Sequence, residues 1–265
     1  MNRQRIFATP FILVTLVSCT AVKENLDDTN VLKGDNRGNE IVAEYLKRDS
    51  APFRKTKVRL SVAESGRPTK QYVLESWRRQ KDGETRTLTH ALEPEEERDL
   101  ASLTFEKPEV PAVNVSYVAS QKRFRESGTG KIFFGGLTSQ ELLGEWRKYG
   151  SKFLSEKEID GKKMLEVESK LLGGRKSVIT RILTLFDSAS YLPRELRLFN
   201  SDGRQLRTFK ITETKTLDGR EVVAKTIIAN HIHKTTVTIK LLDISFPKVI
   251  PEEVFEREYL KQFAK

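Results

Sequence analysis

The stretch Lys57-Val58-Arg59-Leu60-Ser61-Val62 alternates polar or charged residues with aliphatic ones. A period of two residues is the pattern of a β-strand that buries one face. A Gly-Arg-Pro turn follows, and residues 72–77 predict the next strand. Asp82-Gly83 is a strong signal for a two-residue hairpin that joins this strand to a third, at residues 85–92. An antiparallel meander is therefore expected to begin near residue 55.

Three more Asp-Gly pairs recur at turn-like spacing farther along the chain. Strands joined by such turns are typical of an antiparallel meander, and no alternation of strands with helices points to a parallel sheet. The chain is therefore predicted to be mainly β, in the α+β class, with one large curled antiparallel sheet. The further strands are expected at residues 100–105, 113–118, 123–125, 153–158, 164–169, 177–186, 194–200, 206–213, 222–229 and 235–242.

Two or three short helices are expected to cover this sheet. Residues 39–48 place four apolar side chains on one helical face, with Asn39 as the candidate N-cap. A Thr-x-x-Glu capping box opens a predicted helix at 138–148, and a proline opens a short one at 251–255. Since a curled sheet with one apolar face needs a cover, the first two helices are expected to supply it.

The first 18 residues have the organisation of an export signal. Two arginines form a positive n-region, and residues 6–17 form an apolar core that is too short to span a bilayer. The ending Leu16-Val17-Ser18-Cys19 resembles the bacterial lipobox, which implies that Cys19 carries diacylglycerol and further acylation, with chains such as palmitate. An ordinary secretory signal with a free thiol is the alternative. Cys19 is the only cysteine of the 265 residues, so a disulfide within the chain is impossible.

The predicted organisation is a signal peptide at 1–18, a flexible tether at 19–38 and a single domain at 39–265. The tether is polar and of mixed charge, and such a segment buries too little surface to offset the entropy of ordering it. Thr20 follows the cysteine where, in the enterobacterial rule, an acidic residue would retain a lipoprotein in the inner membrane. The presence of Thr20 at this position favours the periplasmic face of the outer membrane.

The formal net charge of +10 raises nucleic-acid binding as a possibility. An exported chain does not meet nucleic acid, so no nucleic-acid partner is expected. Cationic side chains outside the cytoplasm meet anionic lipid head groups or acidic partners, or they simply solvate the outer faces of strands. Beyond the signal, no run of apolar residues is long enough for a membrane helix, so membrane attachment is expected through the lipid anchor alone.

Residues that could carry catalysis are scarce in this sequence. It contains no Gly-x-Ser-x-Gly elbow, no Gly-rich phosphate loop and no His-Glu-x-x-His motif. His231 and His233 would lie on one side of a strand and could bind a metal, but a hairpin turn is expected at 230–234, where they would be exposed turn residues. His90 lies alone in a predicted strand and is expected to be structural. The sequence therefore predicts no enzyme, no cofactor and no metal site.

Three segments of the second half follow a common order: an aromatic-Gly loop before an acidic-Leu helix, a strand–turn–strand around an Asp-Gly turn, and a closing strand before a terminal helix. They lie at 134–142, 191–211 and 235–255. In this order and spacing, residues 132–260 resemble the family of outer membrane lipoprotein-sorting proteins, whose members are periplasmic carriers. The resemblance implies an incomplete antiparallel barrel whose open side is covered by helices, with an apolar cavity for acyl chains between them.

The resemblance also suggests which residues touch a ligand. The loop at 127–137 contains glycines, and its apolar residues could form a mobile cavity mouth next to the helix at 138–148. The expected mouth and lid residues are Ile132, Phe133, Phe134, Leu137, Leu142 and Trp146. A role as plain core is the alternative for these side chains, and Trp77 could likewise line the cavity or belong to the core.

The function expected from these patterns is that of a non-enzymatic, lipid-anchored protein facing the periplasm. It would bind lipid or lipoprotein acyl chains in an apolar cavity and take part in their transport or sorting to the outer membrane. Because it is itself anchored, it would act as a receptor rather than as a diffusing shuttle. The alternative is an accessory or sensor module that binds a membrane transporter or another envelope protein without carrying lipid.

Overall fold

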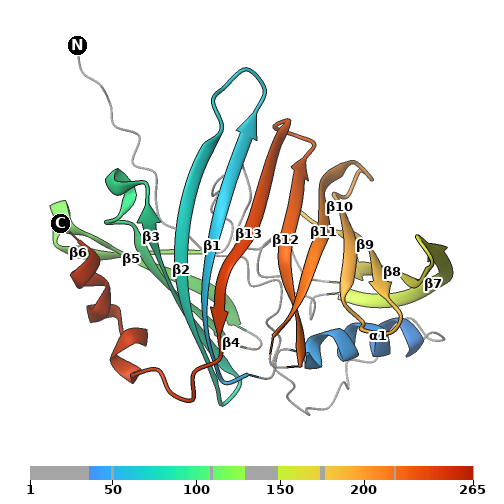
Figure 1. Cartoon of the computed structure of the whole chain (residues 1–265), viewed down its shortest axis with the longest axis horizontal. Helices are drawn as coiled ribbons and strands as arrows, with labels where there is room; N and C mark the ends of the chain where they lie inside the picture. Colours follow the sequence, from blue (N-terminus) through green and yellow to red (C-terminus); the bar gives the residue numbers. More distant parts are fainter. Residues whose placement is uncertain are drawn as a thin grey trace.

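The computed structural model describes residues 36–48, 51–107, 110–128, 149–173, 177–217 and 219–264. In these residues, 13 antiparallel strands form one open sheet, accompanied by one α-helix and short 3-10 helices (Figure 1). The predicted large, curled antiparallel sheet with few helices is confirmed. The elements are α1 (Asn36–Lys47), β1 (Phe53–Glu64), β2 (Lys70–Lys81), β3 (Glu84–Glu93), η1 (Glu95–Glu97), β4 (Ala101–Lys107), β5 (Val110–Val118), η2 (Ala119–Gln121), β6 (Arg123–Gly128), β7 (Tyr149–Ile159), β8 (Lys162–Leu171), β9 (Arg181–Asp187), β10 (Pro193–Phe199), β11 (Gln205–Leu217), β12 (Arg220–Asn230), β13 (Thr235–Ser245), η5 (Glu252–Phe255) and η6 (Arg257–Phe263).

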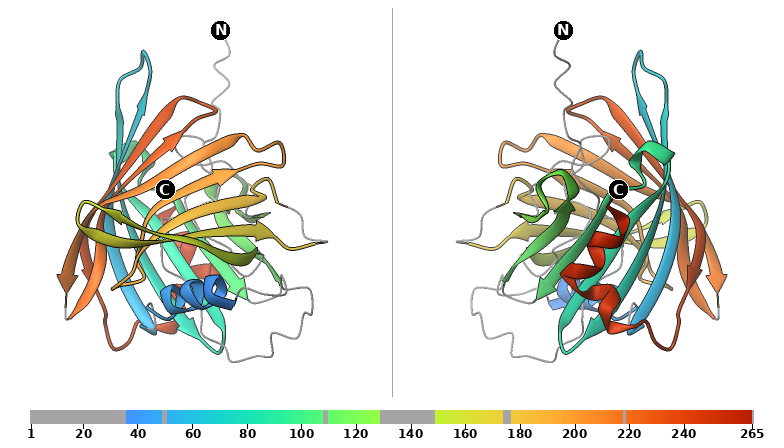
Figure 2. Two further views of the ribbon diagram at one scale, coloured as in Figure 1. Left: turned by 90° about the vertical axis from the view of Figure 1, so that its right-hand side faces the viewer. Right: turned by 90° about the vertical axis from the view of Figure 1, so that its left-hand side faces the viewer.

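The chain builds the sheet as two meanders that meet at its centre. β1 to β6 follow one another towards one edge, and β7 to β13 run from the opposite edge back to the centre, where β13 pairs with β1. The edge strands β6 and β7 are not neighbours, so the sheet is an incomplete barrel. We call the two meanders, β1 to β6 and β7 to β13, the wings of the sheet, and both curve to the same side (Figures 1 and 2). We call the concave side the inner face and the convex side the outer face.

Hairpin turns occur where the first two Asp-Gly pairs predict them. The φ angles are 51° and 75° at Asp82-Gly83, and 51° and 70° at Asp160-Gly161. Positive φ at both central residues is the geometry of a type I′ turn, whose twist matches that of the flanking strands. In the turn before β11, the Asn200 side-chain oxygen accepts two backbone hydrogen bonds. These turns set strand pairing locally.

Several boundaries differ from the prediction. α1 begins at Asn36, and Asn39 does not cap it, because its side-chain oxygen accepts a hydrogen bond from the backbone N–H of Ser151 in β7. β6 extends to Gly128, so the start of the expected loop at 127–137 is strand. The terminal helix is longer than the predicted 251–255, since η6 follows η5.

The apolar side of the sheet changes between its two wings. Residues directly opposite in neighbouring antiparallel strands lie on the same face, so the registers assign every side chain to a face. In β7 to β13 the buried apolar side chains lie on the inner face, together with those of α1. In β3 to β5 the large buried side chains Leu88, Leu103 and Val115 lie on the outer face, where η5 and η6 cover them (Figure 2). Ala91 of β3 lies on the inner face, opposite Leu74.

Candidate functional site

The site residues that the sequence singles out lie outside the described residues. They are Cys19, Ile132, Phe133, Phe134, Leu137, Leu142 and Trp146. Their roles as anchor, mouth and lid therefore stay predictions. The expected helix at 138–148 lies outside the described residues as well.

The inner face of the sheet offers a candidate site within the described residues. From β1 and β2 through β13 to β8, this face carries a continuous set of buried aliphatic and aromatic side chains. We call it the apolar inner surface. Its members include Val58, Leu60, Leu74, Ala91, Val167, Ile182, Phe186, Leu196, Leu198, Phe209, Ile228, Val237 and Ile239. A surface of this chemistry suits alkyl chains, which bind by removal of apolar area from water.

α1 lies against one end of the apolar inner surface (Figure 2). Its predicted apolar face is buried, and the Tyr45 ring lies 5.9 Å from that of Phe186 between centroids. A Cβ at Gly38 would lie 2.6 Å from backbone atoms of Ser151, Lys152 and Phe153 in β7. The helix can approach the strand this closely only because residue 38 has no side chain.

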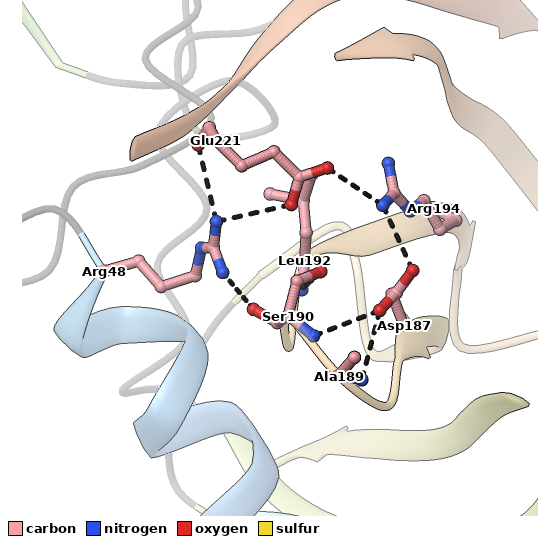
Figure 3. A network of polar contacts seen from close by, with 7 residues as sticks. All are labelled: Arg48, Asp187, Ala189, Ser190, Leu192, Arg194 and Glu221. Atoms are coloured by element: carbon pink, nitrogen blue, oxygen red, sulfur yellow. Dashed lines mark hydrogen bonds and ion pairs between the residues drawn. The ribbon is translucent and has the colours of Figure 1, made fainter. Parts of the chain in front are cut away.

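Arg48, just after the last turn of α1, ties the helix to the loops of the sheet (Figure 3). Its guanidinium donates to the Ser190 carbonyl and lies 3.5 Å from Glu221 Oε2. Glu221 Oε1 is 3.0 Å from Arg194 Nη2, which is 3.1 Å from Asp187 Oδ2. We call Arg48, Asp187, Arg194 and Glu221 the α1 latch. Two arginines share the Glu221 carboxylate, so the latch is a network rather than an isolated pair.

The latch carboxylates have lowered pKa values. Burial alone would raise the pKa of Asp187, but the hydrogen bonds from Ser190 and Arg194 lower it below its ordinary value. Burial would also raise the pKa of Glu221, and hydrogen bonds with Thr214 and Arg194 lower it. Both carboxylates are therefore ionised near neutral pH, which keeps the latch charged.

The inner face of β1 to β5 has a different chemistry. Two neighbouring cross-strand rows hold only polar side chains, and all of them are buried. We call these rows the polar inner surface. The first contains Arg54, Arg78, Thr87, Thr104 and Asn114, and the second contains Thr56, Ser76, Thr89, Ser102 and Ser116.

The polar inner surface is not predicted by the patterns of the sequence described above. The sequence pattern that could have indicated this surface is a threonine at every second position of β3, at 85, 87 and 89. The apolar Leu88 lies on the other face of the same strand. Such a pattern is ordinarily the solvent side of a strand. Only the tertiary structure shows that this polar side faces the inside of the curl.

Trp77 and His90 lie on the outer face, so Trp77 belongs to the core there and does not line the inner face. The Trp77 ring is 6.2 Å from that of Tyr259, and the His90 ring stacks on Phe263 at 4.7 Å. Glu75 accepts a hydrogen bond from Trp77 Nε1 at 3.1 Å and lies 3.3 Å from His90 Nε2. His90 is thus structural, as predicted.

The other two histidines lie in the turn between β12 and β13, as the hairpin interpretation predicts. His231 Nε2 is 2.9 Å from Thr208 Oγ1, and His233 is exposed. Within the described ranges, no three His, Cys, Asp or Glu side chains are gathered so that they could hold a metal ion. Among the helices described, none combines the length and apolar character needed to cross a membrane.

Comparison with solved structures places this fold among known ones. A domain from Vibrio parahaemolyticus assigned to outer membrane lipoprotein sorting matches with a TM-score of 0.76 and 18% identity, covering 84% of this chain and 98% of that domain. A DUF1329 family protein from Desulfovibrio piger matches with a TM-score of 0.74 and 15% identity, over 84% and 96% of the two chains. A LolA superfamily protein from Nitrosomonas europaea has a TM-score of 0.68 and 14% identity, over 84% and 98%.

Comparison by sequence gives a family but no curated relative. No curated protein matches the chain. The model of a family described as "uncharacterized protein" matches residues 83–262, which is more than half of the chain. The fold is the Lol-like one that the resemblance implies. The chain therefore belongs to this family of uncharacterized proteins, whose matched region here has the LolA-like fold.

Proposed function

We propose that this protein is a non-enzymatic protein of the bacterial cell envelope that binds lipid or lipoprotein acyl chains on its inner face and takes part in their transport or sorting to the outer membrane. The observation that carries the proposal is the apolar inner surface, which spans the concave side of the sheet from β3 through β2, β1 and β13 to β8. Its similarity in fold to a domain assigned to outer membrane lipoprotein sorting supports the same function.

The energetics of such binding favour long alkyl chains. Each buried CH₂ group contributes about 0.8 kcal/mol, so an acyl chain of palmitoyl length supplies ample affinity before the cost of ordering it. α1 lies across one end of the surface and is held by the latch, so it is the described element best placed to cover a bound chain. In this proposal the latch positions α1 and takes no part in chemistry.

The proposed location is the periplasmic face of the outer membrane, with the chain attached through acylated Cys19. Residues 1–18 would be the signal peptide, 19–38 the tether and 39–265 the ligand-binding domain. Replacing Cys19 by Ser removes the acylation site, so the variant is expected to leave the membrane fraction. Membrane retention of Cys19→Ser at the level of the unchanged protein would contradict the anchor.

One observation favours a second function, that of an accessory or sensor module which binds a transporter or another envelope protein. The α1 side chains Ile41, Val42 and Tyr45 already fill their part of the inner face, and Tyr45 packs against Phe186. A filled inner face leaves less room for lipid. In that case α1 would be a permanent part of the core rather than a cover.

Native mass spectrometry of the full-length protein, purified from membranes in detergent, separates the two functions. A discrete noncovalent mass that disappears after organic extraction would identify a bound lipid and support the proposal. A protein mass without such an adduct, and without uptake of added phospholipid or acyl-peptide, would contradict lipid binding and favour the interaction module.

A matched pair of variants tests where the lipid binds. Val62 is partly buried and packs against the apolar inner surface, whereas its neighbour Ala63 is exposed on the outer side of β1. Val62→Lys places a charge at the inner surface and is expected to reduce lipid retention by about tenfold or more. Ala63→Lys is expected to retain lipid as the unchanged protein does. Equal retention by both variants would exclude the inner face as the binding site.

A further inference from the structure

Two neighbouring hairpins at the centre of the sheet concentrate positive charge. Residues 59–70 join β1 to β2, and residues 225–240 join β12 to β13. We call these two segments the basic hairpins. Their cationic side chains are Arg59, Arg67, Lys70, Lys225, Lys234 and Lys240, and their only carboxylate is that of Glu64. In the whole chain 47 Lys or Arg residues stand against 37 Asp or Glu residues, so the excess of cations is far larger in these hairpins.

The strand registers bring three of these cations into one row. Arg59 of β1 lies directly opposite Lys240 of β13, which lies directly opposite Lys225 of β12. The row is on the outer face, because the adjacent residues Val58 and Ile239 belong to the apolar inner surface. Like charges directly opposite one another destabilise a sheet. The stability of the sheet therefore does not explain this row.

Carboxylates compensate only part of this charge. Lys225 Nζ lies 3.0 Å from Glu213 Oε1 on the neighbouring strand β11. At the tip between β1 and β2, the Arg67 guanidinium lies 2.9 Å from the Glu64 carboxylate. Both pairs lie at the surface, where water and salt weaken the attraction between the partners.

The other cations are compensated less or not at all. Lys70 interacts electrostatically with Glu97 of η1. Arg59, Lys234 and Lys240 form no ion pair with any of the residues that the structure describes. The nearest acids on the outer face of β13 and β2 lie one row farther from the tips, opposite Lys57. The basic hairpins therefore keep an excess of positive charge.

The position of the basic hairpins makes this charge accessible. Their loops project at the top of Figure 1, whereas α1 lies at the bottom. The side chains at the tips, Arg67, Lys70 and Lys234, are exposed, and so are Arg59 and Lys240 on the outer face. This face is the convex side of the sheet. Long cationic side chains spread over a convex surface suit an extended anionic surface better than one small ligand.

The composition of the hairpins favours a membrane over a protein as this anionic surface. Stable protein interfaces place aromatic or apolar anchors at their centre and exclude charge from it. The basic hairpins expose no large apolar side chain. Within the described ranges, the exposed ones are Val110, Leu154, Ile159, Val178 and Val249, all outside these hairpins.

We infer that the basic hairpins dock on the anionic surface of a lipid bilayer, with their outer side towards the phospholipid head groups. This contact is separate from the anchor predicted at Cys19, and it goes beyond the proposed function, which concerns the inner face. Lys and Arg near an anionic leaflet are attracted to it over a distance of about 8 Å at physiological ionic strength. Docking therefore depends on anionic lipid and on salt.

The test is acetylation of lysine side chains on the membrane. The full-length protein is reconstituted into vesicles of phosphatidylcholine alone, or of phosphatidylcholine and phosphatidylglycerol in equal parts. Peptide mass spectrometry then measures acetylation at each lysine. Acetylation of Lys234 and Lys240 is expected to be about fivefold slower in the vesicles with phosphatidylglycerol, because several cations contribute to the attraction. Exposed Lys162, in the hairpin between β7 and β8, is the internal control and should react equally in both.

A combined variant tests whether the hairpin tips provide the contact. It neutralises three exposed tip residues and leaves Lys240 as the readout, which should then react equally in both kinds of vesicle. A second variant removes the same charge from exposed lysines near the turns at the α1 end of the sheet, and it should keep the protection of Lys240. The first variant is Arg67→Gln, Lys70→Gln and Lys234→Gln, and the second is Lys81→Gln, Lys162→Gln and Lys215→Gln.

The outcomes separate membrane docking from the alternatives. Equal acetylation of Lys240 in both kinds of vesicle by the unchanged protein would overturn the inference. Protection by added polyglutamate but not by phosphatidylglycerol would assign the surface to an acidic protein instead. Loss of protection in both combined variants would show that net charge, rather than the hairpins, attracts the membrane, and would also overturn it.

The inference can fail independently of the proposed function. The tip residues lie outside the apolar inner surface, so the variant with neutral tips is expected to retain lipid in native mass spectrometry as the unchanged protein does. Protection of Lys240 together with absence of bound lipid would support docking and contradict only lipid binding on the inner face.

Discussion

Glu75 organises the outer face around one carboxylate. It accepts a hydrogen bond from Trp77, lies within bonding distance of His90, and pairs with Lys55 at 3.2 Å. The hydrogen bond with His90 is the largest cause that lowers the pKa of Glu75, which falls from 4.5 to about 2 although burial opposes the shift. The rings that this carboxylate positions are the ones on which η6 packs.

Glu75→Gln is expected to destabilise the protein at pH 7 by about 1–2 kcal/mol, because it removes a charged hydrogen-bond acceptor. Since the folded-state pKa is lowered, the stabilisation by Glu75 is complete above the ordinary pKa of 4.5 and is lost as the pH falls towards 2. The stability difference between the two proteins should therefore shrink below pH 4.5. Urea unfolding at a series of pH values measures it, with the surface variant Glu64→Gln as the control. A difference that is independent of pH would contradict this account.

At the scale of elements, α1 is attached to the sheet at both ends. Gly38 near its start touches the backbone of β7, and Arg48 after its end joins the latch. The buried side chains between these points follow the helical period that the sequence shows. The attachment is therefore a combination of a local pattern and two tertiary contacts.

Gly38→Ala is expected to destabilise the protein by about 1–3 kcal/mol, because its Cβ would overlap three backbone atoms of β7. In a free helix the same change would stabilise by about 1 kcal/mol, so the sign of the effect reports the contact. Gly128→Ala is the control, since nothing lies near a Cβ at that position. Thermal unfolding of the three proteins measures the effect, and a stabilised Gly38→Ala would show that α1 does not rest on β7.

Arg48→Gln is expected to loosen α1 without unfolding the sheet. The variant leaves Glu221 with one guanidinium partner instead of two and removes the hydrogen bond to Ser190. Amide hydrogen exchange of α1 should accelerate about tenfold while exchange in β1 and β13 stays unchanged. Lys47→Gln, a change at an exposed neighbour whose ion pair with Glu44 lies within the helix, serves as the control. Uniform acceleration across the sheet would mean that the latch supports the whole fold.

At the scale of the whole molecule, the defining feature is that β7 to β13 and β3 to β5 bury their large apolar side chains on opposite faces. The wing from β7 to β13 packs its apolar side inwards against α1, and β3 to β5 pack theirs outwards against η5 and η6. The terminal helices η5 and η6 therefore form a second core together with the outer face of β3 to β5. The rows of the polar inner surface lie on the other face of these strands and contain no apolar side chain. The inner face is therefore amphipathic, with the apolar inner surface next to the polar inner surface.

Phe255→Ala is expected to cost about 3–5 kcal/mol of unfolding free energy, because Phe255 is fully buried between η5 and the outer face. The lipid retained per folded molecule should not change, since the residue does not touch the inner face. Val249→Ala, at a position 72% exposed, should change neither quantity. Chemical denaturation and native mass spectrometry together check the pair. Loss of lipid from folded Phe255→Ala would mean that the two cores are coupled.

The features that can be predicted from the sequence are those set by near neighbours. The alternation in 57–62 places β1, the Asp-Gly pairs place hairpin turns, and the helical spacing of Ile41, Val42 and Tyr45 places the buried face of α1. Each depends on contacts within a few residues. The lipobox around Cys19 and the mouth residues from Ile132 to Trp146 are also read from local pattern, and they stay predictions.

The rest depends on contacts between distant segments. A row of alternating threonines is ordinarily interpreted as the solvent-exposed face of a strand, because the two-residue period does not show which face is buried. The curvature of the whole sheet places the face that carries Thr87 and Thr89 on the inside (Figure 2). Likewise, the pairing of β1 with β13 and the meeting of Arg48 with Glu221 join residues far apart along the chain. By itself, the sequence determined the strands, their turns and the amphipathic helix, because short-range sterics and hydrophobic period govern them. The tertiary structure alone decided which faces meet, because burial is a property of the folded whole.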